Sequence, residues 1–128
     1  MQNLIQETDG LSHENMRSIR DALDILGGKW KIPILLCLRN GSMRFKDLQR
    51  EVHGITAKIL SKELRELEMN KIINKKEYGD CPVITEYSTT AYCKSLKKIV
   101  EGLQEWGDYH RALIFNRLPN EQAEVNHL

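Results

Sequence analysis

The chain has 128 residues, of which 41% are apolar and 29% are charged, and its formal net charge is +1. This length corresponds to one domain, and the apolar content is enough to fill one hydrophobic core. The longest apolar run, Ile32 to Leu38, is far shorter than the roughly 20 residues of a membrane span, and no signal peptide is recognised. The sequence therefore predicts a soluble cytoplasmic protein without membrane contact.

The first part of the chain predicts two scaffold helices. Ile19, Leu23 and Leu26 lie at helical spacing, and Gly27-Gly28 should end this helix. A second helix is predicted from Trp30 to Leu38, where Pro33 is tolerated because it falls in the first turn. We expect a single domain over residues 13–118, with a flexible N-terminal arm at residues 1–12 and a flexible tail at residues 119–128.

The middle of the chain has the pattern of a helix-turn-helix motif. Two short amphipathic segments, which begin at Phe45, flank a tight His53-Gly54-Ile55 turn. Thr56 is a favourable N-cap residue, and Ala57 to Glu68 contains neither Gly nor Pro, so the second segment should be a helix. In such motifs the second helix enters the major groove of DNA, while the first lies across the backbone.

The predicted second helix has one apolar and one cationic face. Leu60, Leu64 and Leu67 fall on a narrow stripe, and the acidic residues are expected at the flank and towards the C-terminal end. A charged helix face is often only a solvated surface. Here the basic side chains form a row without opposing acids, which favours DNA binding. The residues predicted to line the groove are Thr56, Lys58, Ser61, Lys62 and Arg65.

A β-hairpin is predicted directly after this helix. Asn70 is a plausible helix stop, and the segments Ile72 to Tyr78 and Val83 to Ser88 have the β-branched and aromatic content of strands. Lys75 and Lys76 could simply protect a sheet edge from aggregation. Because the hairpin follows the helix-turn-helix pattern, we instead interpret it as a wing whose lysines contact phosphates. Arg44 and Lys46 are also expected to touch the DNA backbone.

The distribution of charge along the chain supports the prediction of DNA binding. Residues 29–76 contain 12 Lys or Arg and 5 Asp or Glu, whereas acidic residues outnumber basic ones on both sides. A basic segment inside a nearly neutral chain is the electrostatic footprint expected of a DNA-binding protein.

A longer helix is predicted over about residues 92–116. Its apolar stripe continues for nearly three heptads, which is more than a small domain needs. Such a stripe can belong to an intramolecular core. DNA-binding modules of this kind usually dimerise to span two half-sites, however, so we assign the stripe to a dimer interface. On this seam His110 could sense pH, but a neutral hydrogen-bonding role is favoured. The predicted interface residues are Leu23, Leu96, Ile99, Leu103, Trp106, His110 and Leu113.

The cysteines and histidines do not predict a metal or catalytic site. The three cysteines lie far apart, so neither a zinc site nor a disulfide framework is expected. Cys37 is interpreted as a core residue. Cys81, in the predicted wing turn, should be exposed near Lys75 and Lys76, conditions that favour a reactive thiolate, so a redox-sensing role is a hypothesis here. No nucleophile with a base and no cofactor loop is found, which disfavours an enzyme.

The chain resembles the HxlR-type winged-helix transcriptional regulators from about Ala22 to His110. The motifs that carry the resemblance are Gly27-Gly28-Lys29-Trp30, Arg44-Phe45 with Leu48, Gly54-Ile55, Leu64-Arg65-Glu66-Leu67-Glu68, Glu86-Tyr87-Ser88 and Trp106-Gly107. Their order and spacing make the match specific. The resemblance implies a homodimeric bacterial DNA-binding protein, related in architecture to the MarR regulators, that controls nearby genes in response to a chemical signal.

Some positions depart from the family pattern. Many members have a Cys-Pro pair ten residues before the first Gly of the Gly-Gly-Lys-Trp motif, and in some of them this cysteine senses oxidants or electrophiles. This chain has Arg17 and Ser18 there. Cys93 stands where the family usually has Gly, and Thr85 replaces the usual Val. The redox mechanism of the family is therefore not carried over to this chain.

The sequence as a whole predicts a mainly α winged helix-turn-helix fold, with a three-helix core, a small β-hairpin wing and terminal dimerisation helices. The expected function is sequence-specific binding of double-stranded DNA by a homodimeric repressor, which acts on a pseudo-palindromic operator and responds to an unknown small-molecule or reactive effector. No cofactor is expected. The alternative is an adaptor whose basic surface docks on an acidic protein without reading DNA.

Overall fold

The computed structural model describes residues 12–115. Its elements, in chain order, are α2 (His13–Leu26), α3 (Lys31–Leu38), β1 (Met43–Arg44), α4 (Phe45–Glu51), α5 (Ala57–Met69), β2 (Ile73–Tyr78), β3 (Ile84–Thr89), the 3-10 helix η1 (Tyr92–Leu96) and α6 (Lys97–Ile114). The chain divides into two compact units, of which one is residues 20–95 and the other contains residues 12–19 and 96–115. The predicted fold class, mainly helical with a small β wing, is confirmed.

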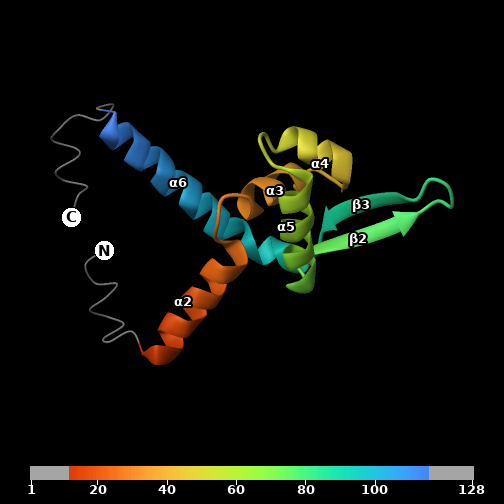
Figure 1. Ribbon diagram of the computed structural model, residues 1–128. Coiled ribbons are helices and arrows are strands. Elements are labelled where there is room, and N and C mark those ends of the chain that lie inside the picture. The colour runs from red at the N-terminus through yellow and green to blue at the C-terminus, as the bar shows by residue number, and fades with distance from the viewer. Residues whose placement is uncertain (1–11, 116–128) are drawn as a thin grey trace. The chain divides into compact units, whose positions relative to one another are not determined.

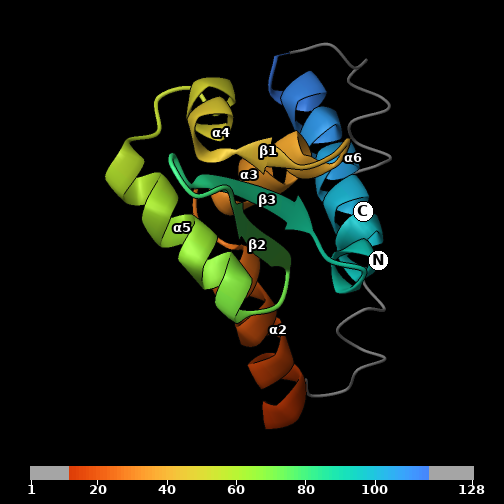
Figure 2. The same cartoon turned by 90° about the vertical axis from the view of Figure 1, so that its right-hand side faces the viewer.

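The unit of residues 20–95 contains helices α3, α4 and α5 and a small sheet, together with the end of α2 and most of η1. Helices α3, α4 and α5 lie together, and the β2–β3 hairpin extends away from them (Figure 1). Viewed from the hairpin side, α5 runs alongside the strands (Figure 2). The predicted end of the first helix before Gly27 is confirmed, since α2 ends at Leu26. This arrangement leaves one long side of α5 free of other elements of the unit.

The sheet has three antiparallel strands in the order β1-β3-β2. The two longer strands form the predicted hairpin, and their bounds agree with the prediction to within one residue. The short strand β1 was not predicted. It pairs with β3 through Met43 opposite Tyr87 and Arg44 opposite Glu86, so it anchors the segment before α4 to the middle of β3.

The core of this unit is formed by aliphatic side chains from all three helices and the sheet. The most deeply buried are Ile34, Leu38, Leu48, Leu60, Leu64, Leu67 and Ile73, each less than 2% exposed. Because protein interiors are closely packed, side chains with so little exposure hold the helices at defined distances from one another. The position of α5 on the surface is therefore set by its buried leucines.

The Thr90 hydroxyl connects the end of α5 with the start of η1. Its oxygen lies 2.8 Å from the carbonyl oxygen of Lys71 and 3.1 Å from that of Ile72. The same oxygen accepts a hydrogen bond of 3.2 Å from the backbone N–H of Cys93. One side chain thus fixes the residues that follow α5 against the first turn of the C-terminal helical segment.

The other unit contains α6, which has 18 residues. The sequence predicts one helix over about residues 92–116, whereas the structure has a 3-10 turn at Tyr92–Leu96 before α6 begins. Asn116 lies outside the described residues. Among residues 12–115, none of the helices combines the length and apolarity needed to cross a lipid bilayer.

Candidate nucleic-acid interface

The turn before α5 has the backbone geometry of a helix-turn-helix motif. Gly54 has a φ of +86°, a conformation in which an L side chain is strained. Thr56 adopts an extended conformation, and its hydroxyl oxygen accepts a hydrogen bond of 3.2 Å from the backbone N–H of Ile59. The predicted N-cap is therefore confirmed. At the other end, Asn70 is the C-cap residue, as the sequence predicts.

The two faces of α5 differ in burial as predicted. Leu60, Leu64 and Leu67 are at most 1% exposed, so this stripe packs on the core. The predicted groove residues are all exposed and lie on the rest of the helix surface: Thr56, Lys58, Ser61, Lys62 and Arg65. The folded unit therefore presents hydroxyl, ammonium and guanidinium groups on the exposed surface of α5, and these groups can donate hydrogen bonds to phosphates or base edges.

The prediction that the basic row has no opposing acids is wrong at Lys62. The Lys62 ammonium nitrogen lies 3.8 Å from Glu66 Oε2 and 4.0 Å from Glu63 Oε2. Residues four positions apart face each other on a helix, so Glu66 comes directly beside Lys62. Two of the acids expected at the flank thus lie next to the middle of the cationic row.

A second correction concerns Glu63, which is buried rather than at a solvated flank. Its carboxylate accepts a hydrogen bond of 2.9 Å from the Lys31 ammonium group, which also donates to Glu66 at 2.6 Å. Glu63 follows Leu60 by three residues, so its position on the buried stripe could have been inferred from helical spacing. Its partner Lys31 begins an apolar helix 32 residues earlier, and no local pattern links the two.

The wing presents its predicted basic residues at the surface. Lys75 and Lys76 are both exposed on β2. The Lys75 ammonium nitrogen lies 3.3 Å from Glu77 Oε1, and this pairing raises the pKa of the Lys75 ammonium group. The ammonium group of Lys76 lies 5.8 Å from the centre of the Tyr78 ring. Lys75 is therefore partly compensated by a carboxylate on its own strand.

Two basic residues that precede the turn, Arg44 and Lys46, are predicted to touch the DNA backbone, and both are exposed. Arg44 belongs to β1 and is the N-cap residue of α4, and Lys46 lies in the first turn of that helix. The pairing of β1 with β3 places Arg44 opposite Glu86 in the middle of the wing strand β3. Candidate DNA contacts thus come from β1, α4, α5 and β2, all within the unit of residues 20–95.

The three cysteines differ in accessibility. All are free thiols, Cys81 is exposed in the turn between β2 and β3, and Cys37 and Cys93 are half-buried. Burial raises the pKa of the Cys37 and Cys93 thiols and so reduces their thiolate fraction. A redox role for Cys81 stays a prediction. Among residues 12–115, no three His, Cys, Asp or Glu side chains come together in a way that could bind a metal ion.

Most of the predicted dimer residues are exposed. Ile99, Leu103 and Trp106 of α6 are 48%, 54% and 64% exposed. His110 is also exposed and stacks on Trp106, with ring centres 4.9 Å apart and planes within 7° of parallel. Leu96 and Leu113 are half-buried, and Leu23 of α2 is 63% exposed. Large apolar side chains exposed in a row are typical of a protein interface.

Comparison with known proteins gives consistent matches. Residues 25–114 match the model of a family described as HxlR-like helix-turn-helix. The HTH-type transcriptional regulator YkvN of Bacillus subtilis is 41% identical over 87 residues, which are 68% of this chain and 74% of the relative. The redox regulator HypR in its reduced form has a TM-score of 0.71 and 33% identity, over 77% of this chain and 98% of HypR. A MarR-family regulator from Enterococcus faecalis V583 has a TM-score of 0.70 and 29% identity, over 86% of this chain and 99% of its own.

Proposed function

The chain belongs to the HxlR-like helix-turn-helix family, and we propose that this transcriptional regulator acts as a homodimeric repressor on a pseudo-palindromic operator. The family and the matched relatives are transcriptional regulators rather than enzymes. Repression requires the protein to occupy a promoter that would otherwise bind polymerase. The proposal therefore depends on sequence-specific recognition of double-stranded DNA, which takes place in the bacterial cytoplasm.

The observation that carries the proposal is the surface of α5. The helix follows a tight Gly turn, is capped by Thr56, and is held on the core by three leucines. Its exposed side carries Lys58, Ser61, Lys62 and Arg65. In helix-turn-helix proteins such a helix enters the major groove, where Arg and Lys can bind the N7 and O6 acceptors of guanine.

The remaining basic residues are proposed to hold the helix in register. Arg44 and Lys46 precede α5, and Lys75 and Lys76 follow it on the wing. Phosphate contacts position a protein on the duplex but carry little sequence information. We therefore assign base recognition to α5 and backbone binding to these four residues.

Dimerisation is supported by the exposed apolar row on α6. A single recognition helix reads only a few base pairs, and a dimer spans two half-sites about 34 Å apart. Burial of Ile99, Leu103 and Trp106 against a second copy would remove apolar surface from water, which favours association. We assign these residues, together with Leu23, Leu96, His110 and Leu113, to the subunit interface.

The proposal includes a chemical signal that releases the operator. A small-molecule or reactive effector would act on the dimer, and the exposed thiol of Cys81 is the candidate for a reactive species because Cys37 and Cys93 are half-buried. Replacement of Cys81 by Ser should then abolish any effect of mild oxidants on DNA binding. Equal sensitivity of the parent and the Ser variant would remove Cys81 from the mechanism.

Binding to duplexes tiled across the region upstream of the protein's own gene tests the proposed function. We expect one duplex to bind much more tightly than the others, with an affinity that falls log-linearly as salt is raised because counterions are released. A protected-DNA footprint should then show two related half-sites. Equal, weak binding to every duplex, together with tight binding to an acidic protein, would support the adaptor function instead.

A further inference from the structure

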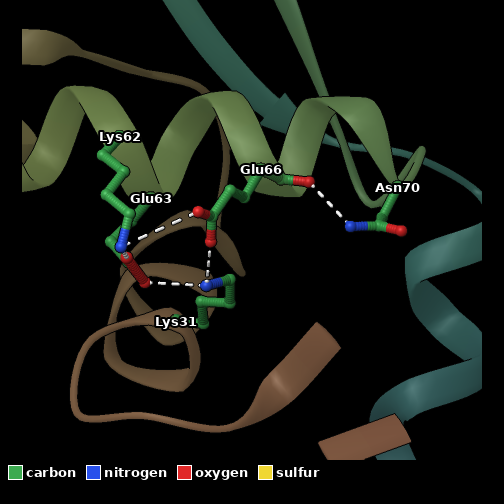
Figure 3. Close-up of polar contacts among 5 residues, drawn as sticks. All are labelled: Lys31, Lys62, Glu63, Glu66 and Asn70. Atoms are coloured by element: carbon green, nitrogen blue, oxygen red, sulfur yellow. Dashed lines mark hydrogen bonds and ion pairs between the residues drawn. The ribbon is translucent and has the colours of Figure 1, made fainter. Parts of the chain in front are cut away.

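Four charged side chains form a connected network under the cationic face of α5 (Figure 3). Lys31 of α3 donates hydrogen bonds to Glu63 Oε1 at 2.9 Å and to Glu66 Oε1 at 2.6 Å. The second oxygens of the same two carboxylates face Lys62, at 4.0 Å and 3.8 Å from its ammonium nitrogen. Two carboxylates thus lie between one lysine of the scaffold and one lysine of the proposed DNA-binding surface.

The side chains of the two lysines of the network differ in how freely they can move. The Lys31 side chain is 7% exposed, so its position is set by the surrounding core. The Lys62 side chain is 64% exposed and can turn towards solvent or DNA. Because Lys31 holds one oxygen of Glu66, the other oxygen stays beside Lys62. Glu66 is therefore a fixed counter-charge, unlike a carboxylate on a freely rotating surface side chain.

The other two cations of this surface are not compensated in the same way. Within the described part of the chain, Lys58 and Arg65 form no ion pair, although both are exposed like Lys62. The network also carries two positive and two negative charges, so it contributes no net positive charge to the proposed groove surface. Among the cations of α5, Lys62 is the one within 4.0 Å of a protein carboxylate, so DNA would have to displace a carboxylate there.

We propose that Glu66 is a positioning residue that limits DNA affinity by holding the Lys62 ammonium group against α5. This inference rests on the proposed function, in which α5 contacts DNA. When the duplex approaches, a phosphate or base acceptor has to replace Glu66 beside Lys62, and the carboxylate left behind repels the phosphates. Glu66 thereby keeps the protein from binding too tightly to duplexes that offer only electrostatic contacts.

The proposal predicts that neutralising Glu66 strengthens DNA binding through Lys62. Exposed ion pairs of this type have small interaction free energies, so Glu66→Gln should raise the affinity for DNA by about two- to five-fold at low salt. If the released Lys62 binds a phosphate, the plot of log affinity against log salt should become steeper by about 0.9 for each subunit. The gain should shrink as salt screens the interaction. A purely structural role for Glu66 predicts weaker binding instead.

A double-mutant cycle isolates the effect of the contact between Glu66 and Lys62 on DNA affinity. Affinity is measured by fluorescence anisotropy, over a series of salt concentrations, for a duplex from upstream of the gene and for a scrambled duplex of equal length. The variants are Glu66→Gln, Lys62→Gln and the double variant. Glu51→Gln is the control, because it removes an equal charge from α4 at an exposed position that forms no ion pair in the described chain. We expect the gain in DNA affinity of Glu66→Gln to exceed that of Glu51→Gln only when Lys62 is present.

The outcomes separate this inference from the proposed function. If Glu66→Gln binds no better than Glu51→Gln, or keeps its full gain without Lys62, the role of Glu66 is refuted even though Lys62→Gln weakens binding. If Lys62→Gln and Arg65→Ala both bind DNA like the parent, α5 is not the DNA-binding helix and the proposed function fails.

Folding of each variant is checked by circular dichroism before binding is measured. If Glu66→Gln does not fold, Glu66→Asp replaces it in the cycle. The Asp side chain keeps a negative charge near Lys31 but is one methylene shorter, so it reaches less far towards Lys62. It should then show part of the affinity gain, and no gain in this variant would refute the inference.

Discussion

Lys31 and Glu63 form a buried ion pair between the start of α3 and the middle of α5. The ammonium group donates to Glu63 Oε1 at 2.9 Å, and the two side chains are 7% and 9% exposed. Glu66 accepts a second hydrogen bond from the same nitrogen, so the Lys31 ammonium group is paired on two sides. This pair links the scaffold to the proposed DNA-binding helix by charge as well as by apolar packing.

Replacement of Lys31 by Ala should destabilise the fold strongly. Glu63 would remain buried without its hydrogen-bonded cation, with only the exposed Lys62 ammonium group at 4.0 Å, and breaking a buried pair in this way typically costs about 3 to 5 kcal/mol. The free energy of unfolding, measured by denaturant titration, should fall by that amount. The control is Arg50→Ala, which breaks an exposed pair with Asp47 and should cost at most about 1 kcal/mol. Equal losses in the two variants would mean that the Lys31 network adds nothing special to stability.

The stabilisation from the Lys31–Glu66 pair should depend on pH in a defined direction. The hydrogen bond from Lys31 lowers the pKa of Glu66, so this contribution is complete above the unfolded pKa of about 4.3 and is lost as pH falls through the folded pKa. Burial alone would lower the pKa of Lys31, but its hydrogen bonds to Glu63 and Glu66 raise it overall. The Lys31 contribution is therefore complete below about pH 10.4 and is lost as pH rises through the folded pKa.

Denaturant titrations of the parent and Glu66→Gln across this pH range check the prediction. The difference in unfolding free energy between the two proteins should be constant from about pH 5 to pH 9 and should shrink below about pH 4. A difference that grows as the solution is acidified would contradict the assigned direction.

Arg65→Ala should weaken specific DNA binding by about 1 to 3 kcal/mol if Arg65 contacts a base edge. Its side chain lies on the exposed face of α5, so thermal unfolding of the variant should be nearly unchanged. Lys62→Ala should act in the same direction but less strongly, because Glu66 already competes for that lysine. Parent-like affinity of both variants for the operator would show that this helix does not read DNA.

The wing lysines should affect all DNA sequences alike. Replacing Lys75 and Lys76 together by Ala is expected to reduce affinity equally for operator and scrambled duplexes and to flatten the salt dependence by up to about two units of slope. The single change at Lys76 should have the larger effect, since Lys75 is paired with Glu77 at 3.3 Å. The hairpin would be only structural if the salt slope of the double variant stayed the same.

Trp106→Ala should weaken dimerisation more than it weakens the folded subunit. Trp106 is 64% exposed in the single chain, so most of its apolar surface would be buried only if a second copy covered it. Removing a large side chain that is fully enclosed there costs about 3 to 5 kcal/mol, and the loss should appear as melting that depends on protein concentration. Asp108→Ala, on the opposite face of α6, is the control. Sedimentation of the parent as a monomer at tens of micromolar would overturn the interface.

Local features of the fold could be predicted because each depends on neighbours in sequence. The N-cap at Thr56, the C-cap at Asn70 and the stripe of Leu60, Leu64 and Leu67 follow from rules that act within a few residues. The hairpin was also predictable, since its two strands are joined by a turn that contains Gly79 and Pro82. These elements determine where the candidate DNA-binding helix begins, ends and faces the core.

Some of the features that sequence reasoning missed depend on distant partners. The strand β1 has two residues, too few for a periodic pattern, and exists because Met43 pairs with Tyr87. Glu63 was expected at the flank of the helix, and only Lys31 in another helix makes its burial favourable. The compensation of Lys62, by contrast, could have been inferred from the sequence, since Glu66 follows Lys62 by four residues and faces it on the helix.

The hydroxyl of Thr90 closes the β2–β3 hairpin at the end away from its turn. It joins the carbonyl groups just after α5 to the backbone N–H of Cys93, at the start of the segment that leads into α6. The backbone N–H of Thr90 also donates to the Ile72 carbonyl group at 3.0 Å, so the side chain and the main chain both hold this junction. The residues that leave α5 and those that enter η1 are therefore constrained to move together.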